Sequence, residues 1–235
     1  MNIFSRIFKS QNGLQKYSLK TTREEREDFS SSIISSSAPS SGFYLLLVLA
    51  TFIVVIGLVK DNLVLLIGGM LVAPLLSPIL SISLGITILN FKVISRSVFV
   101  FIVSAFVTLV VAAVIGLGID FSLSDLGVVT LMANFSWSTF LIPVAAGAAA
   151  SFTWAKKDLT GSLSGVAITV TLMPPLAAMG LALASREPDV FKDALAVYGL
   201  NVSGIIIGSL VIFLVLGFYK SSKAVIQEVE KEENN

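Results

Sequence analysis

In the apolar part of this chain, the side chains that could bind a ligand are polar but uncharged. Ser77 and Ser81 stand in one apolar segment, Thr169 and Thr171 in a second, and Asn201 in a third. Hydroxyl and amide groups donate and accept hydrogen bonds, so together they suit the binding of a small solute or an ion. The alternative is that the hydroxyls bond to carbonyls of their own helices, whereas a buried amide needs several partners.

Prolines accompany these hydroxyls. Because proline lacks a backbone donor and clashes with the preceding turn, a helix is predicted to break or kink at each pair. In lipid, a broken helix must be shielded by protein or face a watery cavity, where its free backbone groups add binding capacity. The candidate path for a solute or ion therefore comprises Pro74, Ser77, Pro78, Ser81, Thr169, Thr171, Pro174, Pro175 and Asn201.

The two proline-containing stretches resemble each other. An offset of 97 residues aligns Gly68 with Gly165, Leu75 with Leu172, Pro78 with Pro175 and Leu84 with Leu181. Two unrelated spans are the alternative, since proline and glycine are common in membrane helices. The register extends into the neighbouring apolar segments, which favours an internal repeat.

Composition sets the class of protein. Of 235 residues, 55% are hydrophobic and 13% charged, and the mean hydropathy is +0.91, whereas soluble domains carry about 25% charged residues. The chain is therefore predicted to be an integral membrane protein whose first partner is the lipid bilayer. A net charge of +1 gives no sign of a nucleic-acid partner.

Catalytic chemistry is not expected. The chain has no cysteine and no histidine, which removes the usual thiolate and imidazole nucleophiles, bases and metal ligands. The interiors of the predicted spans also lack charged residues, the usual marks of proton relays. We expect no catalytic residue, no metal site and no cofactor, and the chain is predicted not to be an enzyme.

Six apolar segments indicate an all-α polytopic fold. They cover about residues 41–59, 63–89, 97–119, 137–154, 159–184 and 194–219. The 97-residue offset relates the first three to the last three, and units with an odd number of crossings must be inverted. We therefore expect two inverted three-helix repeats, 41–119 and 137–219, joined by an external interfacial linker, 120–136. The second helix of each repeat is predicted to break at proline.

The flanking regions are polar. Residues 1–40 form a predicted cytoplasmic region, in which 1–9 suit either a membrane-surface helix or a frayed terminus. A capping box at 22–25 opens a short charged helix through Asp28, and the serines of 30–41 suggest a linker. The charged tail, 220–235, is predicted to be cytoplasmic.

Charge favours one topology. With six crossings, thirteen Lys and Arg residues lie on one side and three, Lys60, Arg186 and Lys192, on the other. If the two proline-containing segments were re-entrant hairpins, the division would be nine against seven. The positive-inside rule favours six crossings of the cell membrane with both termini in the cytoplasm.

A run of small residues, 145–151, centres on Gly147. Such a face lets a second helix approach closely. The contact lies either within one subunit or between subunits, and it supports the expectation of a homo-oligomer.

Several motifs carry a family likeness. They are Gly68-Gly-Met-Leu-Val-Ala-Pro-Leu-Leu-Ser-Pro-Ile-Leu, Ala145-Ala-Gly-Ala-Ala-Ala-Ser, Gly165-Val-Ala-Ile, Leu172-Met-Pro-Pro-Leu-Ala and Gly199-Leu-Asn201. In this order they resemble a bacterial and archaeal family of uncharacterised hydrophobic domains, domain of unknown function 389. The resemblance implies a multispan membrane protein and names no substrate.

The favoured hypothesis is a transporter that moves a small solute or ion between the paired broken helices. One alternative is a non-transporting oligomeric scaffold or envelope-stress component, whose prolines serve packing. Another is a pore formed by an oligomer.

Overall fold

A computed structural model describes residues 23–123, 137–155 and 164–220. These residues form helices and no strand, which confirms the all-α class for the part of the chain described. The helices are α3 (Arg23–Ser36), α4 (Ser41–Val59), α5 (Leu63–Val72), α6 (Leu76–Thr87), α7 (Phe91–Leu117), α9 (Trp137–Ala155), α10 (Ser164–Ser185), α11 (Pro188–Val215) and the 3-10 turn η2 (Phe218–Lys220).

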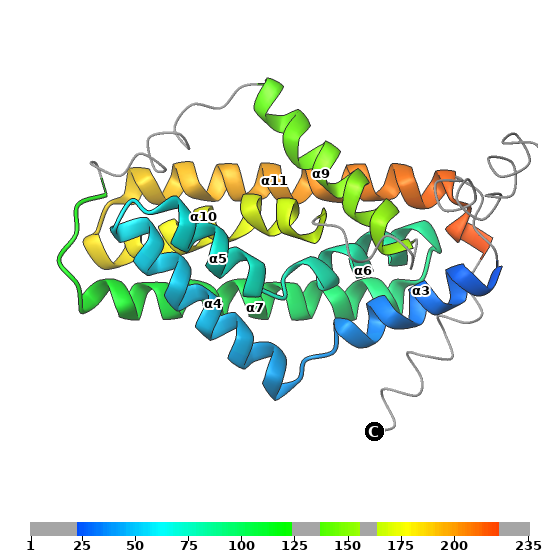
Figure 1. Cartoon of the computed structure of the whole chain (residues 1–235), viewed down its shortest axis with the longest axis horizontal. Helices are drawn as coiled ribbons and strands as arrows, with labels where there is room; N and C mark the ends of the chain where they lie inside the picture. The colour runs from blue at the N-terminus through cyan, green and yellow to red at the C-terminus, as the bar shows by residue number, and fades with distance from the viewer. Residues whose placement is uncertain (1–22, 124–136, 156–163, 221–235) are drawn as a thin grey trace, which may run out of the picture.

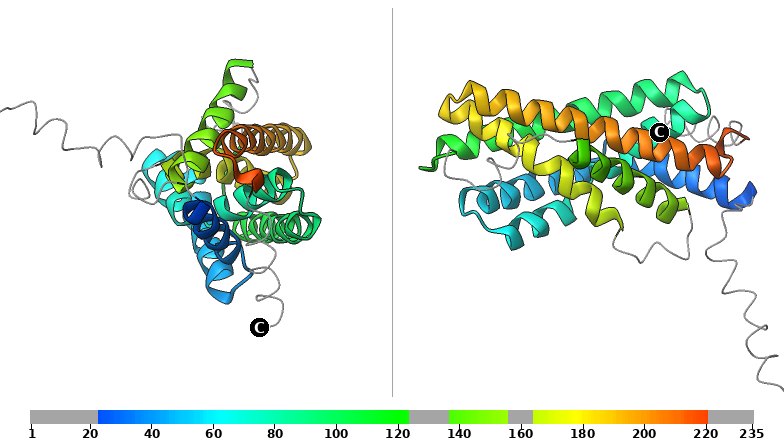
Figure 2. Two further views of the ribbon diagram at one scale, coloured as in Figure 1. Left: turned by 90° about the vertical axis from the view of Figure 1, so that its right-hand side faces the viewer. Right: turned by 90° about the horizontal axis from the view of Figure 1, so that it is seen from above.

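Two long helices define the axis of the bundle. In Figure 1, α7 and α11 run along the longest dimension in opposite directions, and the left view of Figure 2 shows both nearly end-on. The shorter α4 and α9 slant across opposite sides of the bundle. Between them, α10 packs against α7, and α6 packs against α11. Each of these two contacts joins the predicted first repeat to the second.

Membrane insertion follows from helix length and composition. Among the described residues, α4, α7 and α11 are each long and apolar enough to cross a bilayer, and α5 with α6 qualifies as a fourth, bent span. The outward sides of α4 and α7 carry exposed large apolar residues such as Phe52, Phe99 and Phe106. Such surfaces suit lipid, so the chain is membrane-embedded.

The third helix of each predicted repeat begins earlier than expected. We predicted starts near residues 97 and 194, but α7 begins at Phe91 and α11 at Pro188. Caps set these starts: the Asn90 Oδ1 atom accepts hydrogen bonds from two backbone N–H groups of the first turn, and proline is favoured at the first helical position. Apolar composition marks where lipid begins, whereas the helix itself starts one to two turns before it.

The serine-rich segment after Asp28 is helical, contrary to the predicted linker. Helix α3 continues to Ser36, and Phe29, Ile33 and Ile34 are buried on one of its faces. The Ser30 hydroxyl donates to the carbonyl of Arg26 at 2.7 Å. Serines therefore bond within the helix while the apolar face anchors it, which composition alone did not indicate.

The 97-residue offset reappears in the helix bounds. Shifted by 97, α4 covers 138–156 and α7 covers 188–214, whereas α9 is 137–155 and α11 is 188–215. The turns before α7 and α11 also agree, since Leu89 and Arg186 both have positive φ, 55° and 60°. In each turn the next residue donates its N–H five residues back, Asn90 to Gly85 at 3.0 Å and Glu187 to Ala182 at 2.9 Å.

The small-residue run of α9 makes its contact inside the chain. A Cβ on Gly147 would meet the backbone of Ile205 in α11, and one on Gly208 would meet the Val144 carbonyl. A Cβ on Gly204 would lie 2.9 Å from the Pro143 ring. The α9–α11 pair is therefore close-packed within one subunit, and this run no longer supports the predicted homo-oligomer.

Candidate functional site

The first proline-containing segment breaks as predicted. Helix α5 ends at Val72, Ala73 is extended, and α6 begins at Leu76 after a bend of 54°. Pro74 lies in the break. Pro78 lies in the first turn of α6, where an N–H has no intrahelical acceptor. Pro74 therefore causes the break, whereas Pro78 removes no hydrogen bond from α6.

Protein surrounds the inner half of this broken helix. Every residue of α6 except Ile86 is buried. Lipid therefore cannot reach its backbone, as a broken helix in a membrane requires. Two of its hydroxyls bond within the helix: Ser83 donates to the Ile79 carbonyl at 3.1 Å, and Thr87 donates to the Ser83 carbonyl at 2.9 Å.

Ser81 differs from these two because its partner lies on another helix. The Ser97 hydroxyl of α7 donates to the Ser81 Oγ atom at 2.7 Å, and both side chains are buried. Beside this pair lies a cavity of about 10 Å³, lined by Ile34, Ser37, Ser81, Val93, Arg96 and Ser97. That volume is close to what one water molecule needs.

The second proline-containing segment is a continuous helix, so the predicted break at Pro174 and Pro175 is wrong. Helix α10 runs from Ser164 to Ser185 with Pro174 and Pro175 inside it, and both prolines are buried. A proline φ near −65° is a helical value, so the chain stays helical although the carbonyls of Val170 and Thr171 lose their donors. Thr169 lies on the backbone of α10 as well, but the side chains of Thr169 and Thr171 are outside the described residues.

The two proline sites lie at similar depth. Ala73 follows Leu63 by ten residues, and Pro175 precedes Ser185 by ten, so each site lies about 15 Å from the same end of the bundle at 1.5 Å per residue. Helix α10 packs against α5, and α11, which carries the half-buried Asn201 near its middle, packs against α6. The helices bearing the predicted residues are thus neighbours. Among the described side chains, the structure groups Ser77, Pro78 and Ser81 on α6.

The structure adds residues that the sequence did not single out. The buried side of α7 carries Ser97, Ser104 and Thr108 in addition to its apolar residues. Their spacing of seven and four residues is a helical period that could have indicated a polar stripe. Thr108 is fully buried, and its hydroxyl has no hydrogen-bond partner among the described residues.

An aromatic pair joins α7 to α11. The rings of Phe101 and Tyr198 are stacked, with centroids 6.0 Å apart and planes 3° from parallel. The two residues are 97 positions apart, so they occupy equivalent places in the predicted repeats. The Tyr198 hydroxyl is buried and, like that of Thr108, lacks a partner in the described part of the chain.

Fold and site together define a multi-helix membrane protein whose described part contains a broken helix, α5–α6, with the α6 half enclosed by protein. The chain belongs to the family described as domain of unknown function 389, whose profile matches residues 70–207. This confirms the likeness seen in the sequence motifs. An uncharacterised protein of Methanocaldococcus jannaschii is 29% identical over 168 residues, which cover 72% of this chain and 52% of that protein. The chain thus spans about half the length of this relative. No solved structure matches it.

Proposed function

We propose that the chain crosses the cell membrane six times as two inverted three-helix repeats, with both termini in the cytoplasm. The matching helix bounds and turns support this arrangement. The opposite directions of α7 and α11 also support it. In addition, the second helix of each predicted repeat packs against the third helix of the other, α6 against α11 and α10 against α7. The Lys and Arg distribution supports the orientation.

The Phe101–Tyr198 stack supports a two-fold relation between the repeats. Under two-fold symmetry, residue i of one unit contacts residue j of the other, and a residue close to the axis contacts its own counterpart. Phe101 and Tyr198 are such counterparts at the 97-residue offset, and their rings are in contact. We place the axis between these two rings.

We further propose that the protein transports a small solute or ion along the path between the α5–α6 break and α10. One observation carries this proposal: a membrane helix is broken at Pro74 at about mid-depth, and the half that follows the break, α6, is enclosed by protein. Breaks of this kind expose backbone groups, and paired half-helices in inverted repeats form the substrate sites of many transporters. The proposal includes no catalytic step, metal or cofactor.

A non-transporting scaffold is the second candidate. The hydroxyls of Ser83 and Thr87 donate to carbonyls of α6 itself and leave no hydrogen for a solute. If the hydroxyls of the path itself, those of Ser77, Ser81, Thr169 and Thr171, bind no solute either, the prolines serve packing alone.

Flux measurements in proteoliposomes distinguish the two candidates. We expect the wild-type protein to move at least one member of a panel of ions and small metabolites faster than empty liposomes. Thr171→Val removes a hydroxyl at nearly constant volume, and Pro175→Ala restores a donor for the Thr171 carbonyl. Each change is expected to lower that flux about tenfold, since one polar contact contributes about 1.4 kcal/mol.

Thr153→Val is the matched control. Thr153 donates to the Ala149 carbonyl within α9, so its replacement should leave the flux unchanged. Flux that neither Thr171→Val nor Pro175→Ala alters would place the site elsewhere. Absence of flux for the whole panel would favour the scaffold.

A further inference from the structure

Two buried hydroxyls lack a hydrogen-bond partner in the described part of the chain. They belong to Thr108 on α7, which is 0% exposed, and to Tyr198 on α11, which is 8% exposed. The equally buried Thr51 shows the usual arrangement, since its hydroxyl donates to the Leu47 carbonyl of its own helix at 2.7 Å. A buried polar group without a partner destabilises a fold, and native proteins retain few of them. The hydroxyls of Thr108 and Tyr198 therefore need an explanation other than packing.

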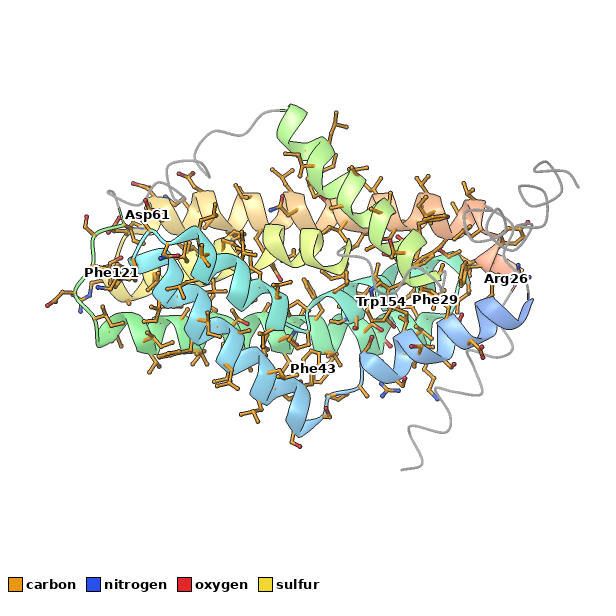
Figure 3. All side chains as sticks on the ribbon, viewed as in Figure 1. Arg26, Phe29, Phe43, Asp61, Phe121 and Trp154 are labelled. Atoms are coloured by element: carbon orange, nitrogen blue, oxygen red, sulfur yellow. The ribbon has the colours of Figure 1, made fainter. Side chains whose placement is uncertain are left out.

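The directions of α7, α10 and α11 fix the depth of these hydroxyls. Figure 3 shows Asp61 and Phe121 at one end of the bundle and Arg26 and Phe29 at the other. Helices α7 and α10 end, and α11 begins, at the end that carries Asp61 and Phe121. In the proposed topology this is the external end.

Thr108 lies level with the proline pair of α10. A Cβ on Gly180 would be 2.5 Å from the Ala112 Cβ atom, so these two residues are neighbours. Because α7 and α10 run in the same direction, one turn back along both helices brings Thr108 level with Leu176. Leu176 follows Pro175 directly. The Thr108 hydroxyl is therefore at the depth of the proposed path.

The Tyr198 hydroxyl lies on the same side of α7 as Thr108. Phe101 and Thr108 are seven residues apart, so they share one face of α7, and the Tyr198 ring is stacked on Phe101. Aromatic side chains in helices lean toward the start of their own helix. Since α11 starts at the external end, the Tyr198 hydroxyl leans outward, toward the level of Thr108. Helix α10 packs against both α7 and α11, so the two hydroxyls lie at the junction of these three helices.

The surroundings of the two hydroxyls are uncharged. Helices α4, α5, α6, α9 and α10 contain no Asp, Glu, Lys or Arg, and neither do residues 97–117 of α7 or 194–215 of α11. An ion bound here would lose its hydration without meeting an opposite charge on a side chain. A hydroxyl both donates and accepts hydrogen bonds, so the pair matches a molecule that does the same and carries no net charge.

We propose that Thr108 and Tyr198 are solute-binding residues beside the proline pair of α10, and that they take a small uncharged solute with both hydrogen-bond donors and acceptors. This rests on the proposed transport function and narrows it, because it selects against ions. Binding supplies the partners that packing withholds, so the two hydroxyls serve transport at some cost in stability.

Removing either hydroxyl without changing the shape of the side chain should not destabilise the protein. Thr108→Val and Tyr198→Phe are expected to leave Tm in mild detergent unchanged or to raise it by up to about 3 °C, because each removes an unpaired buried group. Thr51→Val is the matched control, since it removes a hydroxyl that has a partner, and it should not raise Tm. A fall in Tm for Thr108→Val or Tyr198→Phe would show that the hydroxyl is bonded within the folded protein, and would overturn its assignment to a solute.

Thiol labelling tests solute access without any transport assay. The chain has no cysteine, so Thr108→Cys introduces a single thiol, and Thr51→Cys places one at an equally buried position of α4. Protein in lipid nanodiscs is treated with methanethiosulfonates bearing a hydroxyethyl, an aminoethyl or a sulfonatoethyl group, and each rate is divided by that at the exposed Ser95→Cys. We expect the hydroxyethyl reagent to modify Thr108→Cys at least about tenfold faster than Thr51→Cys, and faster than either charged reagent by a similar factor.

The outcomes separate this site from transport itself. Labelling of Thr108→Cys as slow as that of Thr51→Cys would show that no solute reaches this position. A charged reagent that matched or exceeded the hydroxyethyl reagent would overturn the uncharged class. The expected labelling combined with no flux for the whole panel would refute transport and leave a solute-accessible site at Thr108. Flux combined with a protected Thr108→Cys would refute this site and leave transport standing.

Discussion

Replacing Gly208 by leucine should abolish stable folding of the α9–α11 pair. A Cβ at Gly208 would meet the Val144 carbonyl oxygen and, at 2.8 Å, the Ala148 backbone nitrogen. Backbone atoms of a packed helix cannot move aside as a flexible side chain can. We expect destabilisation of at least about 3 kcal/mol, the upper part of the range for overpacking.

Gly199→Leu is the matched control on the same helix. A Cβ at Gly199 meets nothing within 4 Å, and the residue is exposed. Thermal unfolding in mild detergent, followed by size-exclusion chromatography, compares the two variants with wild type. We expect Gly208→Leu to aggregate or to melt at a much lower temperature, and Gly199→Leu to resemble wild type. Similar melting temperatures for both variants would show that α9 and α11 are not this close.

Tyr198→Ala should be strongly destabilising, whereas Tyr198→Phe should not. Alanine removes a buried ring stacked on Phe101, a change that costs about 3–5 kcal/mol. Phenylalanine keeps the ring and removes only a hydroxyl that has no described partner. Because an unpaired buried hydroxyl is unfavourable, Tyr198→Phe should be neutral or stabilising by about 1 kcal/mol.

Denaturant or thermal titration of the two Tyr198 variants separates these expectations. Tyr198→Phe also makes the pair Phe–Phe and hence chemically symmetric across the proposed axis. If Tyr198→Phe lost as much stability as Tyr198→Ala, the hydroxyl would have to bind a group within the membrane. The ring contact would then not be the source of the stabilisation.

The sequence predicts the bounds of a helix correctly where a capping residue directly precedes the apolar run. Helix α4 has its predicted bounds, Ser41–Val59, because the Ser40 hydroxyl accepts a hydrogen bond from the Phe43 N–H directly before the apolar run. For α7 the cap, Asn90, precedes the apolar run by several residues that include Lys92 and Arg96. Lys92 and Arg96 suggested a loop, so the predicted start of α7, residue 97, is later than the observed start, Phe91.

The two proline sites also show what cannot be predicted from the sequence alone. Pro74 breaks its helix and Pro174 and Pro175 do not, although all three carry the same local signal. Proline removes a donor in each case, but the surrounding helices decide whether the chain bends or continues. The Ser81–Ser97 contact was also beyond the sequence, because it joins residues sixteen positions apart across two helices. Ser81 was identified, while Ser97 and Arg96 were not.

The inverted arrangement of the repeats is tested most directly by labelling one equivalent pair of positions. Ser95 and Lys192 are 97 residues apart and both exposed near the starts of α7 and α11. Single cysteines at these two sites, in a chain with no other thiol, are treated with a membrane-impermeant maleimide in intact cells and in inside-out vesicles. We expect Ser95→Cys to react only in inside-out vesicles and Lys192→Cys only in intact cells. Reaction of both cysteines from the same side would contradict the inverted arrangement.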